Sequence, residues 1–130
     1  MLKISISGVR GYAFKSLTEE VIFSFASAFA SYIKSGAVVL GRDTRVSGKK
    51  IKKIVIKALT GHGIKVYDLG IVPTPTVGIM TKKLKARGGI VITASHNPLP
   101  WNGLKFFGSD GIFLTPQEFK KLEKIYDNKI

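Results

Sequence analysis

The sequence contains no cysteine, which excludes disulfide bonds, thiolate metal sites and cysteine nucleophiles. It does not open with a basic segment followed by an apolar one, and no apolar run approaches the roughly 20 residues that cross a bilayer. The most apolar stretch, residues 21–30, is interrupted by Ser24 and Ser27. We therefore expect a cytoplasmic protein that has no membrane partner.

Acidic residues are scarce: 8 Asp and Glu stand against 21 Lys and Arg, which gives a formal net charge of +13. Such an excess favours anionic partners, whether nucleic acid, an acidic membrane surface or phosphorylated metabolites, and composition does not choose among them. It would also suit a fragment whose acidic counterpart lies elsewhere. With 130 residues, 45% of them apolar, the chain matches one globular domain with its own core.

A buried strand that ends in polar residues is the most informative stretch. Residues 89–94 are a β-branched apolar run, typical of a strand covered on both faces, and Ser95-His96-Asn97-Pro98 follows directly. In open α/β sheets, ligands collect at the carboxyl ends of strands. These side chains are therefore candidates for a functional site, although the tetrapeptide alone would also suit a plain turn.

The segment after this strand is stiff and turns back. Pro98 and Pro100 restrict the backbone of the loop. Asn102-Gly103 predicts a tight turn before a return strand at 104–107, which carries Lys105.

Strands and amphipathic helices alternate along the rest of the chain. Further strands are predicted at residues 3–7, 37–40, 64–69 and 112–114. Helices are predicted after Thr18, Ser47, the turn at 73–76 and a capping box at 115–118. The pattern predicts a single α/β domain over residues 1–130, with three layers (α/β/α) and a mixed, mostly parallel sheet. Residues 124–130 look like a polar linker.

Two other clusters place basic residues beside turns. In Gly8-Val9-Arg10-Gly11, two glycines let the backbone turn tightly around an arginine, which would be either solvated or functional. In Gly41-Arg42-Asp43-Thr44-Arg45, the charges follow a buried strand. These charges predict either a structural ion pair of Asp43 with the arginines or a substrate-binding role.

Residues 93–98, Thr-Ala-Ser-His-Asn-Pro, together with Asn102-Gly103-Leu104-Lys105, resemble the phosphoserine loop of the α-D-phosphohexomutases. Gly-x-Arg-Gly around Arg10, Gly-Arg-Asp-x-Arg at 41–45 and Pro-Thr-Pro at 73–75 also occur in that family's order. The resemblance therefore covers essentially the whole chain. Residues 4–6, Ile-Ser-Ile, differ from the family's usual Phe-Gly-Thr.

The resemblance implies the amino-terminal, phosphoserine-loop domain of an enzyme that interconverts hexose 1-phosphate and hexose 6-phosphate. Glucose or mannose would be the sugar, and a bisphosphorylated sugar the intermediate. Ser95 would carry the phosphoryl group, Lys105 and Arg10 would stabilise charge and handle protons, and His96 would orient substrate or serine. Substrate and phosphate binding is expected at Asn97, Asn102, Arg42 and Arg45.

The resemblance also implies Mg²⁺, bound by the phosphate on Ser95 and by three aspartates of a later domain. The aspartates of this sequence are scattered, at Asp43, Asp68, Asp110 and Asp127. We therefore expect that the chain needs the remaining domains of the mutase as partners, and a phosphorylated hexose as substrate. Alone, it should be inactive.

A second class of function stays open, a basic binding module for phosphosugars or nucleic acid without turnover. Lys49, Lys50, Lys52, Lys53 and Lys57 share one predicted helix, although a solvated helix face explains them more simply. Aromatic residues Trp101, Phe106 and Phe107 near lysines would be the base-stacking candidates, but two of the three lie on an apolar predicted strand, so burial explains them better. No known nucleic-acid-binding motif is present, so a nucleic-acid partner is not expected.

Overall fold

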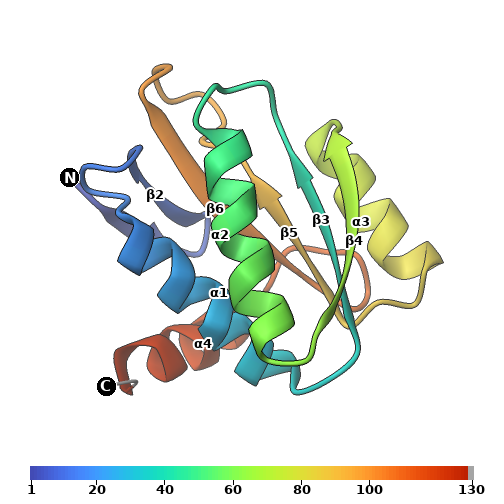
Figure 1. The fold of residues 1–130 in the computed structure, drawn as a ribbon. Coiled ribbons are helices and arrows are strands. Elements are labelled where there is room, and N and C mark those ends of the chain that lie inside the picture. The colour runs from blue at the N-terminus through green and yellow to red at the C-terminus, as the bar shows by residue number, and fades with distance from the viewer. Residues whose placement is uncertain (129–130) are drawn as a thin grey trace.

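Residues 1–128 are described by a computed structural model as a six-stranded sheet with four helices (Figure 1). The strands are β1 (Lys3–Ser5), β2 (Gly8–Tyr12), β3 (Ala37–Arg42), β4 (Lys65–Ile71), β5 (Gly88–Ile92) and β6 (Trp101–Gly108). The helices are α1 (Glu19–Ile33), α2 (Gly48–Gly61), α3 (Thr74–Lys83) and α4 (Pro116–Asn128). The predicted alternation is confirmed, with two differences. Residues 8–12 form a strand, and residues 112–114 contribute only the bridge between Phe113 and Phe107.

The sheet is mixed, in the order β1-β2-β6-β5-β3-β4. β3 pairs in parallel with β4 and β5, whereas β1–β2, β2–β6 and β5–β6 pair antiparallel. The α/β class and the mixed sheet are confirmed, but parallel pairing is confined to one half of the described sheet. The reason is that β5 and β6 are joined by a short loop, and a parallel pair needs a crossover of a dozen residues or more.

Helices cover both faces of the sheet, so the three layers are confirmed. Helices α1, α2 and α4 lie on one face, and α3 lies on the other (Figure 1). Strand β5 shows the division, because Ile90 and Ile92 join the larger core cluster while Val91 joins the smaller one beneath α3. All five residues of β5 are buried, as expected for a strand covered on both faces.

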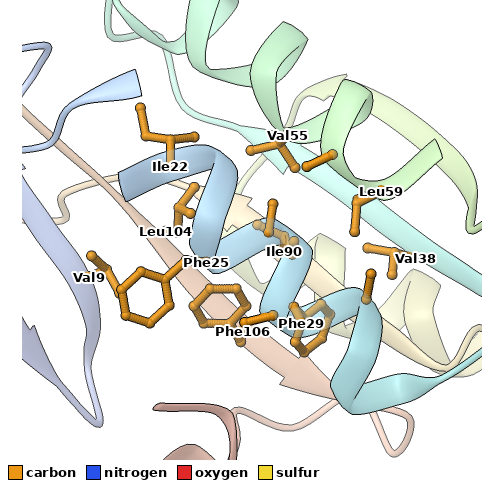
Figure 2. Packing of buried hydrophobic residues seen from close by; sticks show 14 of the residues in the cluster. Val9, Ile22, Phe25, Phe29, Val38, Val55, Leu59, Ile90, Leu104 and Phe106 are labelled. Atoms are coloured by element: carbon orange, nitrogen blue, oxygen red, sulfur yellow. The ribbon is translucent and has the colours of Figure 1, made fainter. Parts of the chain in front are cut away.

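The larger core is built between α1 and the central strands (Figure 2). Phe25 and Phe29 of α1 pack against Phe106 of β6, with ring centroids 6.3 and 5.0 Å apart respectively. Helix α4 covers α1 from outside, where Tyr126 stacks on Phe25 at 3.8 Å. Burying these large apolar side chains fixes β5 and β6 relative to each other, and it therefore fixes the loop between them.

Two of the three predicted hydroxyl caps are confirmed. Thr18 Oγ1 accepts from the Val21 N–H, and Thr115 and Glu118 form the reciprocal capping box. Ser47 does not cap α2, because its hydroxyl accepts instead from the Asn102 side chain.

Helix α4 reaches Asn128, so most of the predicted linker at 124–130 is helical, and its end, 129–130, lies outside the described residues. Within residues 1–128, none of the helices has the length and apolarity to span a membrane.

Candidate active site at the carboxyl end of β5

Ser95 lies just beyond β5, at the edge of the sheet where the parallel strands β3 and β5 both end. Its side chain is exposed, and its backbone has a φ of 54°, in the left-handed region. For a residue other than glycine that conformation costs about 1–2 kcal/mol. The surrounding contacts must therefore hold it in place, as is common at functional sites.

Lys105 of β6 points at this serine. Its Nζ donates a hydrogen bond to Ser95 Oγ at 2.8 Å and also lies 5.4 Å from the centre of the Phe113 ring. Burial lowers the pKa of Lys105 from 10.5, and the nearby positive charge of Arg10 lowers it further. A lysine in such surroundings gives up its proton more readily than a solvated one.

Arg10 of β2 reaches the same loop, where its Nη1 donates to Asn97 Oδ1 at 3.0 Å. Its strand partner is Gly103, and an added Cβ there would lie 2.7 Å from Arg10 Cγ and 2.5 Å from the Val9 carbonyl oxygen. The glycine therefore lets the arginine side chain lie across β6. Arg10 Nε is buried and has no hydrogen-bond partner within the described chain.

The Arg45 guanidinium makes all of its hydrogen bonds to other groups of the protein. Its Nε donates to Asp43 Oδ2 at 3.2 Å, and its two Nη atoms donate to four carbonyl oxygens of the serine loop. These bonds account for all five N–H groups of a guanidinium. Of the two roles considered for residues 41–45, the structural ion pair is the one observed for Asp43 and Arg45.

Arg42 points at the start of α2. Its Nη1 donates to the Asp43 carbonyl oxygen at 3.2 Å, and its side chain lies against Gly48. Its Nε is buried without a partner among residues 1–128. None of its described contacts is with Ser95.

Asn102, one of the predicted substrate ligands, is held inside the sheet, and its role toward substrate stays a prediction. Asn102 lies inside β6 with no exposed surface, and its Nδ2 donates to Ser47 Oγ at 2.8 Å. The predicted tight turn at Asn102-Gly103 is absent, because both residues pair with β2. Sheet pairing with β2 overrides the local turn preference of the dipeptide.

The described structure thus brings Ser95, Lys105, Arg10 and Asn97 together. His96 is exposed, and no hydrogen bond or ion pair joins its ring to residues 1–128. Its predicted orienting role therefore stays a prediction.

Sequence reasoning missed Thr93. Its Oγ1 accepts from the Ser95 N–H at 3.0 Å and donates to Asp43 Oδ2 at 2.7 Å. No local pattern marks this residue, because the carboxylate that it binds lies 50 positions away in the chain.

The aromatic residues considered for base stacking are buried, with exposed fractions of 8% for Trp101 and 4% for Phe106 and Phe107. The prediction that burial explains them better than base stacking is therefore confirmed.

No group of three His, Asp or Glu side chains comes together in the described part of the chain. The carboxylate of Asp43 is already bound by Arg45 and by Thr93, at the start of the serine loop. The residues present therefore do not fit a Mg²⁺ site by themselves.

Comparison with known proteins agrees with the fold and the motifs. Residues 1–130 match the family described as "Phosphoglucomutase/phosphomannomutase, alpha/beta/alpha domain I". A phosphoglucosamine mutase of Bacillus cereus is 41% identical over 128 residues, which cover 95% of this chain and 28% of the relative. A Pyrococcus abyssi protein named as a probable phosphoglucosamine mutase is 40% identical over 123 residues, with coverages of 95% and 27%.

A solved structure from Thermus thermophilus, a candidate phosphomannomutase, superposes with a TM-score of 0.90. It is 32% identical, and the match covers 96% of this chain and 30% of that one. The chain is an α/β/α domain of the phosphohexomutase class. It belongs to the phosphoglucomutase/phosphomannomutase family, as its domain I, and spans less than a third of the length of these relatives.

Proposed function

We propose that this chain is the phosphoserine-bearing domain of a phosphohexomutase, which moves a phosphoryl group between the C1 and C6 oxygens of a hexose. The observation that carries the proposal is the contact of Lys105 Nζ with Ser95 Oγ at 2.8 Å, on an exposed serine at a sheet edge. Membership of the family supports it.

In the proposed reaction, phosphoserine 95 donates its phosphoryl group to a free sugar hydroxyl. The bond from phosphorus to Ser95 Oγ breaks, a bond from phosphorus to the sugar oxygen forms, and the sugar hydroxyl releases its proton to solvent. Lys105 lies where it can give a proton to the departing serine oxygen, and in the return step it takes that proton back. Burial and the nearby charge of Arg10 lower the pKa of Lys105, so it gives up this proton more readily than a solvated lysine would.

Arg10 and Asn97 form the other side of this arrangement. The buried, unpaired Nε of Arg10 is a donor without a partner in the described chain, and a phosphoryl oxygen is the kind of acceptor that it lacks. Asn97 orients the Arg10 guanidinium through the bond at 3.0 Å. We assign charge stabilisation to Arg10 and orientation to Asn97.

Mg²⁺ would add charge neutralisation for the transferring group. From this chain we expect only the phosphate on Ser95 to reach the ion, because no described carboxylate cluster exists to hold it. The other ligands and the sugar-recognition residues would come from further domains of the enzyme, without which this chain should be inactive. The names of the relatives add glucosamine phosphate to glucose and mannose phosphates as candidate substrates.

The test is phosphoryl exchange by the complete mutase that contains this domain, measured with glucose, mannose and glucosamine 1-phosphates in turn. We expect conversion to the 6-phosphate with the natural sequence and none with Ser95→Ala. Lys53→Ala, on the exposed face of α2, should behave as the natural sequence does. Full activity of Ser95→Ala would refute the proposal. Salt-sensitive oligonucleotide binding that Lys53→Ala weakens would instead favour the basic binding module.

A further inference from the structure

Both peptide groups that flank the Ser95 Cα are fixed by side chains from one network. The N–H of Ser95 donates to Thr93 Oγ1 at 3.0 Å, and its carbonyl oxygen accepts from Arg45 Nη2 at 2.8 Å. Holding both neighbouring peptide planes fixes φ and ψ of the residue between them. We propose, on the basis of the proposed function, that Arg45 is a positioning residue for phosphoryl transfer, which holds Ser95 in its left-handed conformation so that its hydroxyl meets Lys105.

Arg45 binds the loop along its whole length. Besides the Ser95 carbonyl, its Nη atoms donate to the carbonyl oxygens of Asn97 at 2.8 Å, Pro98 at 2.8 Å and Trp101 at 3.1 Å. Only a planar, forked cation offers that many donors in one rigid unit, so a lysine at this place would not reproduce the contacts.

Asp43 holds the arginine in turn. Its Oδ1 accepts from the Arg45 N–H at 3.0 Å, and its Oδ2 accepts from Arg45 Nε at 3.2 Å and from Thr93 Oγ1 at 2.7 Å. One carboxylate thus joins the side chain that holds the Ser95 N–H to the side chain that holds the Ser95 carbonyl. The loop after β3 and the loop after β5 become a single unit.

The geometry argues against a direct substrate role for Arg45. All five of its N–H groups are engaged, and its side chain is only 9% exposed. A phosphate could bind to it only by displacing the serine loop. Arg45 should therefore affect the rate of transfer and leave the affinity for the sugar phosphate nearly unchanged.

The first experiment compares Arg45→Lys with Arg87→Lys in the complete mutase, since Arg87 is an exposed arginine outside the loop. Misplacing a reacting group by about an ångström costs roughly 10²-fold in rate. We expect Arg45→Lys to lower kcat by about that factor with little change in KM, and Arg87→Lys to change neither. A raised KM with normal kcat would overturn the proposal, because it would make Arg45 a substrate ligand.

The second experiment does not depend on turnover. Amide hydrogen exchange in this chain should become faster at residues 95–101 in Arg45→Lys, whereas β5 stays protected. Unchanged exchange in the loop would overturn the proposal even if the mutase assay failed for every variant. If the natural sequence shows no phosphoryl transfer but the loop exchanges faster in Arg45→Lys, the proposed function is refuted. The role of Arg45 in holding the loop then still stands.

Should Arg45→Lys fail to fold, Thr93→Val supplies the same test. It removes the acceptor for the Ser95 N–H, and it should show the same fall in kcat and the same faster exchange at 95–101. A rigid loop in Thr93→Val with normal kcat would overturn the proposal.

Discussion

Lys105 Nζ donates to Ser95 Oγ at 2.8 Å. The bond joins the middle of β6 to the loop that follows the neighbouring strand β5. The contact joins an exposed serine hydroxyl to a half-buried lysine whose pKa is lowered. Neither partner is unusual by itself. Their juxtaposition, at a sheet edge where the backbone is held, is the basis of the proposed phosphoryl transfer.

Replacing Lys105 by methionine should slow transfer without unfolding the domain. Methionine keeps the apolar stem but removes the proton donor and the charge, and positioned acid–base groups contribute typically 10²- to 10⁴-fold. We expect kcat of the complete mutase to fall by an amount in that range, measured by coupled assay of 6-phosphate formation. Lys53→Met serves as the control, because Lys53 is exposed on α2. Normal kcat in Lys105→Met would show that another group moves the proton.

Replacing Arg10 by methionine should raise the pKa of Lys105. Burial, the larger cause of the lowered pKa, remains in the variant, whereas the repulsion from the arginine charge disappears. A pH titration of the lysine side-chain NMR signals would measure the change. A fall, or no movement, would contradict the account of this site.

The same lowered pKa has a consequence for stability. The unfolded chain binds this proton more tightly than the folded one does. The contribution of Lys105 to stability is therefore fully present above pH 10.5 and is lost as the pH falls through the lowered folded-state value. In Arg10→Met this dependence should weaken, and chemical denaturation at several pH values would detect it.

Gly103→Ala should destabilise the domain and displace Arg10. The added methyl group would lie 2.5 Å from the Val9 carbonyl oxygen and 3.0 Å from that of Thr93, and both are backbone atoms that cannot move aside cheaply. Overpacking of this kind costs about 1–3 kcal/mol, which urea unfolding would measure. Gly61→Ala is the matched control, because nothing lies within 4 Å of a Cβ there. That substitution should leave stability equal or higher by up to about 1 kcal/mol.

Asn102→Ala should lower stability but not substrate affinity. The substitution leaves the Ser47 hydroxyl without its 2.8 Å donor and opens a void at a position with no exposed surface. Loss of a buried hydrogen-bond partner costs about 1–3 kcal/mol. We expect a lower urea midpoint and an unchanged KM. A raised KM at full stability would restore Asn102 as a substrate ligand.

Local chemistry made much of this fold predictable from the sequence. The caps at Thr18 and Thr115 involve partners three positions away, and the buried run of β5 is visible in its composition. The resemblance singled out Ser95 and Lys105 together, and the structure brings these two residues into contact within one strand–loop–strand unit.

What could not be predicted depends on distant pairing. Asn102-Gly103 has the composition of a turn, but it becomes strand because β2 lies beside it, more than ninety positions earlier in the chain at Gly11 and Arg10. Arg45 meets the serine loop 50 to 56 positions later, so sequence alone left its role open between structure and substrate. Local sequence predicts a helix cap at Ser47, because its actual partner, Asn102, lies 55 positions later in the chain.

The most direct test is to locate phosphate on the protein after incubation of the complete mutase with a hexose 1,6-bisphosphate. Tandem mass spectrometry of the peptide that contains residues 93–105 would identify the modified residue. The account predicts a single phosphate on Ser95 of the natural sequence and none on that peptide in Ser95→Ala. An unmodified Ser95 in an enzyme that still converts the 1-phosphate to the 6-phosphate would contradict it.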